Sequence, residues 1–181
     1  MTRLEEDDMY FQYPLETLAR RRASVRQIDF AREARRVLTD TDEVVFQPLD
    51  HGLAILAANE DALEEPRRIL RDMYGDFVEV RDPRVRYMPG PHEPIMHVRV
   101  TARRDNAPAI LRELRQRRAL VLEECMRDRT FIVRAEARLA SLLGLPARLD
   151  EITGGLAMHS IRLIRYAPVL EGPDGTGPRA A

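Results

Sequence analysis

The sequence predicts an α+β protein of two small modules, each an antiparallel β-sheet backed by helices. Short runs with an apolar residue at every second position alternate with stretches in which apolar residues return at helical spacing. Between the two halves stands Pro89-Gly90-Pro91, which opposes both a helix and a central strand. The 181 residues are enough for two modules with a core each.

The second half contains four strand patterns and two helical patterns. Strands are expected at residues 95–101, 119–126, 131–136 and 156–166, and helices at residues 107–118 and 139–152. Met96, Val98 and Val100 fall on one face of the first strand, which is therefore half-buried. Gly144 and Pro146 interrupt the second helix. The resulting order, βαββαβ, is the split-βαβ or ferredoxin-like pattern.

The first half shows a weaker series of the same kind. A strand pair is expected at residues 44–48 and 53–57, strand-like runs at 77–80 and 84–87, and helices at 28–38 and 61–74. The later helix presents an apolar inner face and ends at Gly75; that face consists of Leu63, Ile69, Leu70 and Met73. An opening strand lies at residues 9–13 or is missing, which leaves open whether this half is a complete second ferredoxin-like unit.

These patterns divide the chain into five parts. They are an N-terminal segment at residues 1–22, the first module at 23–88, a linker at 89–93, the second module at 94–169 and a disordered tail at 170–181. The tail is rich in glycine and proline and has no apolar anchor after its first residue.

Composition excludes several kinds of chemistry and of partner. All 29 basic residues are arginine, so a Schiff-base or P-loop lysine is excluded. Cys125 is the only cysteine, which excludes an intramolecular disulfide and a cysteine metal cage. The acidic N-terminus is not a signal peptide, and no apolar run approaches the ~20 residues of a membrane span. We therefore expect a cytoplasmic protein that does not contact membranes.

The chain carries no catalytic or ligand-binding motif that we recognise. It lacks G-x-x-x-x-G-K-[ST], G-x-S-x-G and H-E-x-x-H. Its four histidines, His51, His92, His97 and His159, do not have the spacing of metal ligands. We expect no catalytic residue, no metal, no cofactor and no bound nucleotide.

Several motifs of the second half, in chain order, resemble the fifth, C-terminal domain of elongation factor G. They are Glu93-Pro94-Ile95-Met96, the helix that ends in Arg117-Arg118, Arg134-Ala135-Glu136-Ala137, Thr153-Gly154-Gly155 and Arg165-Tyr166-Ala167-Pro168. The likeness covers about 75 residues almost without gaps. It implies a ferredoxin-like fold, and in that family the domain contacts ribosomal RNA.

The first half has a more limited likeness to the third domain of the same family, at Ile69-Leu70-Arg71-Asp72-Met73-Tyr74 and Pro83-Arg84-Val85-Arg86-Tyr87. The chain thus resembles domains three and five joined directly, without the GTPase, second and fourth domains. Some positions depart from the family pattern. Ala119 replaces a usual glycine, Leu156-Ala157 a usual Arg-Gly, and His159 a usual phenylalanine. These changes remove positions at which close approach to RNA is expected.

Strand parity places Arg99, Arg134 and Arg162 on three adjacent strands, on the sheet face that points away from the helices. Three guanidinium groups on one face can bind phosphate or carboxylate. The alternative is a solvated face, partly neutralised by Glu136, or a face covered by the other module. No aromatic pair accompanies the arginines, so stacking of RNA bases is not expected there.

Other arginines gather in two helical stretches. Arg115, Arg117 and Arg118 stand at the end of the first helix of the second module, and Arg20-Arg21-Arg22 begins a basic stretch of the first. Each is a candidate for contact with an RNA backbone, and the alternative for each is a solvated helix face.

Taken together, these features favour a non-enzymatic module derived from a translation factor. We expect it to associate with the ribosome or with RNA and not to hydrolyse GTP. The alternative is a protein–protein or homodimerisation module without a nucleic-acid role, which the apolar Ile132 and Ile164 among the arginines would suit. An enzyme acting on a small acidic substrate would need a nucleophile–base pair, and none is recognisable.

Overall fold

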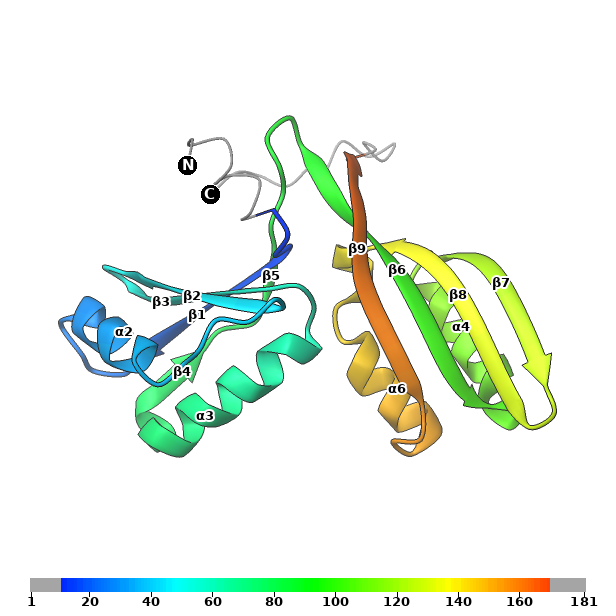
Figure 1. Ribbon diagram of the computed structural model, residues 1–181, viewed down its shortest axis with the longest axis horizontal. Coiled ribbons are helices and arrows are strands. Elements are labelled where there is room, and N and C mark those ends of the chain that lie inside the picture. Colours follow the sequence, from blue (N-terminus) through cyan, green and yellow to red (C-terminus); the bar gives the residue numbers. More distant parts are fainter. Residues whose placement is uncertain (1–10, 170–181) are drawn as a thin grey trace.

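The computed structural model describes residues 11–169, which form two antiparallel sheets, each backed by helices (Figure 1). The strand order is β2-β3-β1-β4 in the first sheet and β7-β8-β6-β9 in the second. Both are the order of a ferredoxin-like unit, in which the first and third strands lie together at the centre. The predicted α+β class with two ferredoxin-like modules is thereby confirmed.

The first module contains four main strands and two helices. They are β1 (Leu15–Arg21), α2 (Gln27–Arg35), β2 (Val44–Leu49), β3 (Gly52–Ala57), α3 (Glu64–Tyr74) and β4 (Val78–Val80). The short 3-10 turns Asp61–Leu63 and Gly75–Phe77 flank α3, and β5 (Arg84–Val85) pairs with β1. Gly52 stands at φ +147°, and a Cβ there would lie 2.5 Å from the carbonyl oxygen of Ala19. Only glycine therefore lets β3 pass this close to β1.

Two predictions for this module were wrong in position. The opening strand is β1 at Leu15–Arg21, inside the predicted N-terminal segment, and residues 11–13 are not a strand. On α3, Met73 is 48% exposed, and Tyr74 is buried in its place. Tyr74 follows Leu70 by four residues, so both fall on the buried stripe of the helix, and its ring contacts Phe30 edge-on.

The second module repeats the topology with longer strands. They are β6 (His92–Arg103), α4 (Ala107–Gln116), β7 (Leu120–Arg127), β8 (Thr130–Arg138), α5 (Leu139–Leu142), α6 (Leu145–Thr153) and β9 (Met158–Pro168). The helical pattern is split as predicted, because Gly144 adopts φ +77° between α5 and α6. β6 begins at His92, within the predicted linker, where a bridge joins His92 to Met88.

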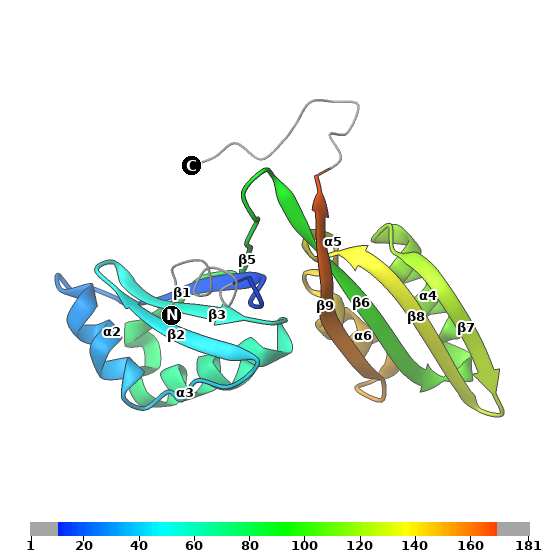
Figure 2. The same ribbon diagram turned by 45° about the horizontal axis from the view of Figure 1, so that its top comes forward.

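The second core lies between the sheet and its helices. Met96, Val98 and Val100 of β6 are fully buried, as their alternation predicts, and meet Ile110 of α4 in the same apolar cluster. The helices lie behind the sheet in both views, which leaves the other face of the four strands open (Figure 2). No helix among residues 11–169 is long and apolar enough to cross a membrane.

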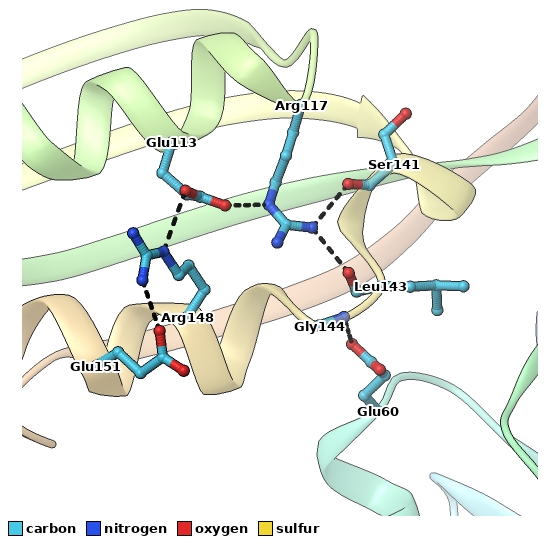
Figure 3. Close-up of polar contacts among 8 residues, drawn as sticks. All are labelled: Glu60, Glu113, Arg117, Ser141, Leu143, Gly144, Arg148 and Glu151. Carbon is cyan, nitrogen blue, oxygen red and sulfur yellow. Dashed lines mark hydrogen bonds and ion pairs between the residues drawn. The ribbon is translucent and has the colours of Figure 1, made fainter.

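The two modules meet where β9 faces the first module, whereas β7 is the strand farthest from it (Figure 1). Asn59 Nδ2 donates a hydrogen bond to the Ile161 carbonyl of β9 at 3.4 Å. Glu60 Oε2 accepts one from the backbone N–H of Gly144 at 2.7 Å (Figure 3). One connection of the first module, immediately after β3, thus contacts both β9 and the α5–α6 junction.

Candidate nucleic-acid interface

The open face of the second sheet brings together the three arginines that strand parity predicts there. Arg99 on β6 lies directly opposite Arg134 on β8. On the other side of β6, Arg162 of β9 lies opposite His97, two residues before Arg99. All three arginines are exposed. The sheet therefore presents three guanidinium groups on adjacent strands and on one side.

These arginines differ in their ion pairs. Arg134 Nη1 lies 2.8 Å from Glu123 Oε2 on β7, so its charge is partly neutralised. Arg99 and Arg162 form no salt bridge within residues 11–169. Like charges directly opposite each other on a sheet destabilise it. The position of Arg99 opposite Arg134 therefore lowers the stability of the sheet.

A bulge in β9 changes the end of this face. The register shifts between Ile95 and Met96, so that Ile164 has no partner and Arg165 lies opposite Ile95. Arg165 therefore joins the open face, where its guanidinium lies 2.8 Å from Glu136. Strict alternation predicts Ile164 at this place instead. The inserted residue leaves no mark in the sequence, so parity could not have identified Arg165.

The arginines at the end of α4 do not form one surface with Arg99. Ile110 and Leu114 of α4 are buried in the core, so this helix covers the opposite face of the sheet. Arg115 and Arg118 are exposed on that side, and Arg118 has a positive φ of 56° just after the helix. Any ligand of these two arginines is therefore separate from a ligand of the open face.

Arg117 is part of the internal structure and is not a free surface charge (Figure 3). Its Nε lies 2.7 Å from Glu113 Oε1, and its side chain is only 18% exposed. Its Nη1 donates to the carbonyls of Ser141 at 2.9 Å and Leu143 at 2.8 Å. Arg148 of α6 contacts the other oxygen of Glu113 at 3.5 Å. Arg117 thus joins α4 to the end of α5 and is occupied by these contacts.

One histidine with a raised pKa, His159, lies at the junction of the modules. His159 Nε2 is 2.9 Å from Asp61 Oδ2, and this hydrogen bond raises the pKa of His159 although partial burial opposes the shift. Burial raises the pKa of Glu60, whose hydrogen bond from Gly144 acts in the opposite direction. The ring of Tyr166 contacts that of Phe11, and its hydroxyl donates to the Phe11 carbonyl at 2.9 Å. These groups connect parts of the fold that are distant in sequence.

The part of the chain that the structure describes contains no cluster of three His, Cys, Asp or Glu residues able to hold a metal ion. Cys125 is half-buried on β7, opposite Ile132. The arginine face can bind anions through charge-assisted hydrogen bonds.

Comparison with known proteins shows what the second module is similar to. Residues 91–174 match the family model described as elongation factor G C-terminus. The chain is 31% identical over 77 residues to elongation factor G of Granulibacter bethesdensis and 31% identical over 80 residues to elongation factor G 2 of Hahella chejuensis. These matches cover 42% and 44% of this chain but only 11% and 12% of the two relatives.

The likeness in three dimensions extends over both modules. A solved protein from Thermus thermophilus superposes on 85% of this chain with a TM-score of 0.62. The match covers 40% of that protein, and the sequences are 14% identical, so this comparison concerns the fold alone.

Proposed function

We propose that this chain, whose residues 91–174 match the elongation factor G C-terminus family, is a non-enzymatic module that binds RNA backbone, with the ribosome as its expected partner in the cytoplasm. The binding surface is the open face of the second sheet. Arg99 and Arg162 are its main contacts. Arg134 is a third contact, whose charge is partly neutralised by Glu123.

The observation that carries the proposal is the pair of unneutralised arginines on neighbouring strands. Arg99 stands opposite another arginine, and no carboxylate within residues 11–169 pairs with it or with Arg162. A phosphate group placed between Arg99 and Arg162 would accept hydrogen bonds from both guanidiniums. Its negative charge would also reduce the repulsion between Arg99 and the arginine opposite it. The free energy that the fold loses by this arrangement is recovered when an anion binds.

The face suits phosphates better than bases. The open-face positions of the two central strands, β6 and β8, carry no phenylalanine, tyrosine or tryptophan. Base stacking on aromatic rings is the usual means by which a sheet binds single-stranded RNA. Contacts to the backbone position a protein on folded RNA without reading its sequence. We therefore expect binding that depends on RNA shape and salt concentration more than on sequence.

The proposal includes no hydrolysis of GTP by this chain. The 181 residues contain no P-loop motif and no lysine to contact the phosphates of a nucleotide. The module then contributes to translation by binding RNA through its arginine face.

The test is co-sedimentation with ribosomes across a salt series, comparing the natural chain with the double variant Arg99→Gln/Arg162→Gln. Each phosphate contact releases counterions, so the slope of log affinity against log salt should fall by about 2 in the variant. Both side chains are exposed, so folding should be unchanged or slightly improved.

The matched control is Arg71→Gln/Arg84→Gln, which removes two exposed charges of the first module that form no salt bridge within residues 11–169. It should retain the natural slope. Equal losses in both variants would show that net charge alone drives association. No association even at low salt would end the proposal.

One observation favours a second function, the joining of protein surfaces. Ile132 is half-buried on the arginine face, and Ile164, which is 45% exposed, lies at the bulge of β9. If two copies meet there, light scattering at high concentration will give twice the monomer mass. In that case Ile132→Glu will restore the monomer, whereas a chain that binds RNA will remain monomeric throughout.

A further inference from the structure

A surface groove is lined by α4 and by Met126 of β7. These two elements lie on the side of the second module farthest from the first (Figure 1). The volume of the groove is about 810 Å³. Pro108 and Leu111 of α4 and Met126 of β7 contribute its apolar floor. Because α4 covers the helix side of the sheet, this groove is separate from the arginine face described above.

The rim of the groove is basic. Arg104, Arg112 and Arg115 line it, all three are exposed, and none forms a salt bridge within residues 11–169. No aspartate or glutamate belongs to the lining. An apolar floor between unpaired guanidiniums is complementary to a ligand that has both apolar groups and carboxylates.

The wall opposite α4 is an edge strand. β7 ends the order β7-β8-β6-β9, so one side of its backbone has no strand partner. A bulge at Leu122 separates its first residues from the regular part, in which Glu123 to Arg127 pair continuously with β8. Met126 of this regular part is 49% exposed and borders the groove. An edge strand beside a helix is the geometry in which proteins accept an extended peptide as an added strand.

We propose that this groove binds an extended acidic peptide of a partner protein, which pairs with β7 and directs alternate side chains towards α4. Side chains on one side of a strand come from every second residue. The peptide therefore places an apolar side chain on Leu111 and Met126, and a carboxylate two residues away reaches Arg112 or Arg115.

The charges argue against the other occupants. A second copy of the chain would bring a second set of the same arginines to the groove, and the two sets would repel each other. An RNA backbone would use the arginines but would leave the apolar floor without a partner. An acidic peptide with apolar side chains matches both parts of the groove.

The test uses the full chain and the labelled peptide Thr-Leu-Thr-Glu-Thr-Leu-Thr-Glu, followed by fluorescence anisotropy at low salt. We expect saturable binding that weakens by about 10- to 100-fold in Arg112→Glu/Arg115→Glu. The matched control, Arg32→Glu/Arg36→Glu, reverses two exposed charges of the first module and should bind as the natural chain does. Arg99→Gln/Arg162→Gln should also keep its affinity for the peptide, which makes this result independent of RNA binding.

Two further peptides decide whether the peptide binds as a strand. In one peptide the backbone nitrogens of the odd-numbered residues are N-methylated, and in the other those of the even-numbered residues. In an added strand, only one of these two sets faces β7. Strand addition requires that one of the two loses most of its affinity. Equal affinity of both methylated peptides with the parent would overturn the proposal. So would displacement of the peptide by an RNA oligonucleotide, or a dimer of the chain that excludes the peptide.

Discussion

The two modules share one topology but use their sheets differently. β3 in the first sheet and β8 in the second occupy the same place in the strand order. All six residues of β3 are buried, on both faces. β8 instead alternates, with Phe131, Val133 and Ala135 buried and Arg134 exposed between them. The strand order sets which residues share a face, and the residue types then decide whether that face packs or binds.

This difference explains why the candidate interface lies in the second module. On the first sheet, Ala54 and Leu56 lie on the side away from the main core cluster and are still buried. On the second sheet, the corresponding positions carry arginine and glutamate. A sheet that is buried on both faces has no free face for a ligand, whereas a sheet with one charged and exposed face can bind one there.

The largest effect is expected from placing one arginine on each of these faces. Leu56→Arg puts a charge where the side chain is 3% exposed and should cost about 3–5 kcal/mol, enough to unfold the first module. Ile132→Arg, on the open face of β8, should cost less than about 1 kcal/mol. Urea unfolding followed by circular dichroism measures both, and equal losses would show that the two faces do not differ.

The next largest effect is a difference in stability between variants of two arginines at the end of α4. Arg117→Ala should cost about 2–4 kcal/mol because it removes contacts to two backbone carbonyls and leaves Glu113, which is largely buried, with Arg148 alone. Arg115→Ala should change the stability by less than about 0.5 kcal/mol, because that side chain is exposed. Thermal unfolding of the two variants provides the comparison. A stable Arg117→Ala protein would mean that its contacts in Figure 3 contribute little.

The second module was more predictable from sequence than the first, for a physical reason. Its strands are half-buried, so Met96, Val98 and Val100 alternate with polar residues and reveal both the strand and its inner face. β1 gives no such signal, because the inward residues after Leu15 are Thr17 and Ala19, which are small or polar. The strand was missed, although it lies at the centre of its sheet.

The candidate site was predictable only where strand parity holds. Arg99, Arg134 and Arg162 lie on the expected face because β6 and β8 are regular and the bulge in β9 comes after Arg162. Arg165 was missed because the bulge reverses parity beyond that point. The internal role of Arg117 was also hidden, since its partners, the Ser141 and Leu143 carbonyls, are backbone groups that residue types do not reveal.

The smallest effect concerns the contact between the two modules. The His159–Asp61 hydrogen bond raises the pKa of His159 in the folded chain above its unfolded value of about 6.5. The folded state therefore holds this proton more tightly. The resulting stability is fully present below the unfolded pKa and is lost as pH rises through the folded pKa. Because the Asp61 side chain is 48% exposed, solvent screens the pair, and we expect about 0.5–1 kcal/mol.

The measurement is the difference in unfolding free energy between the natural chain and His159→Gln, taken from about pH 5.5 to pH 9. The raised pKa of Glu60 also favours the folded state towards acid, but it is common to both proteins and cancels in the difference. His51→Gln, in an exposed turn, controls for the loss of a histidine. A difference that grows with pH would have the wrong sign for this ion pair. A difference that stays constant would mean that His159 joins the modules by packing and not by its charge.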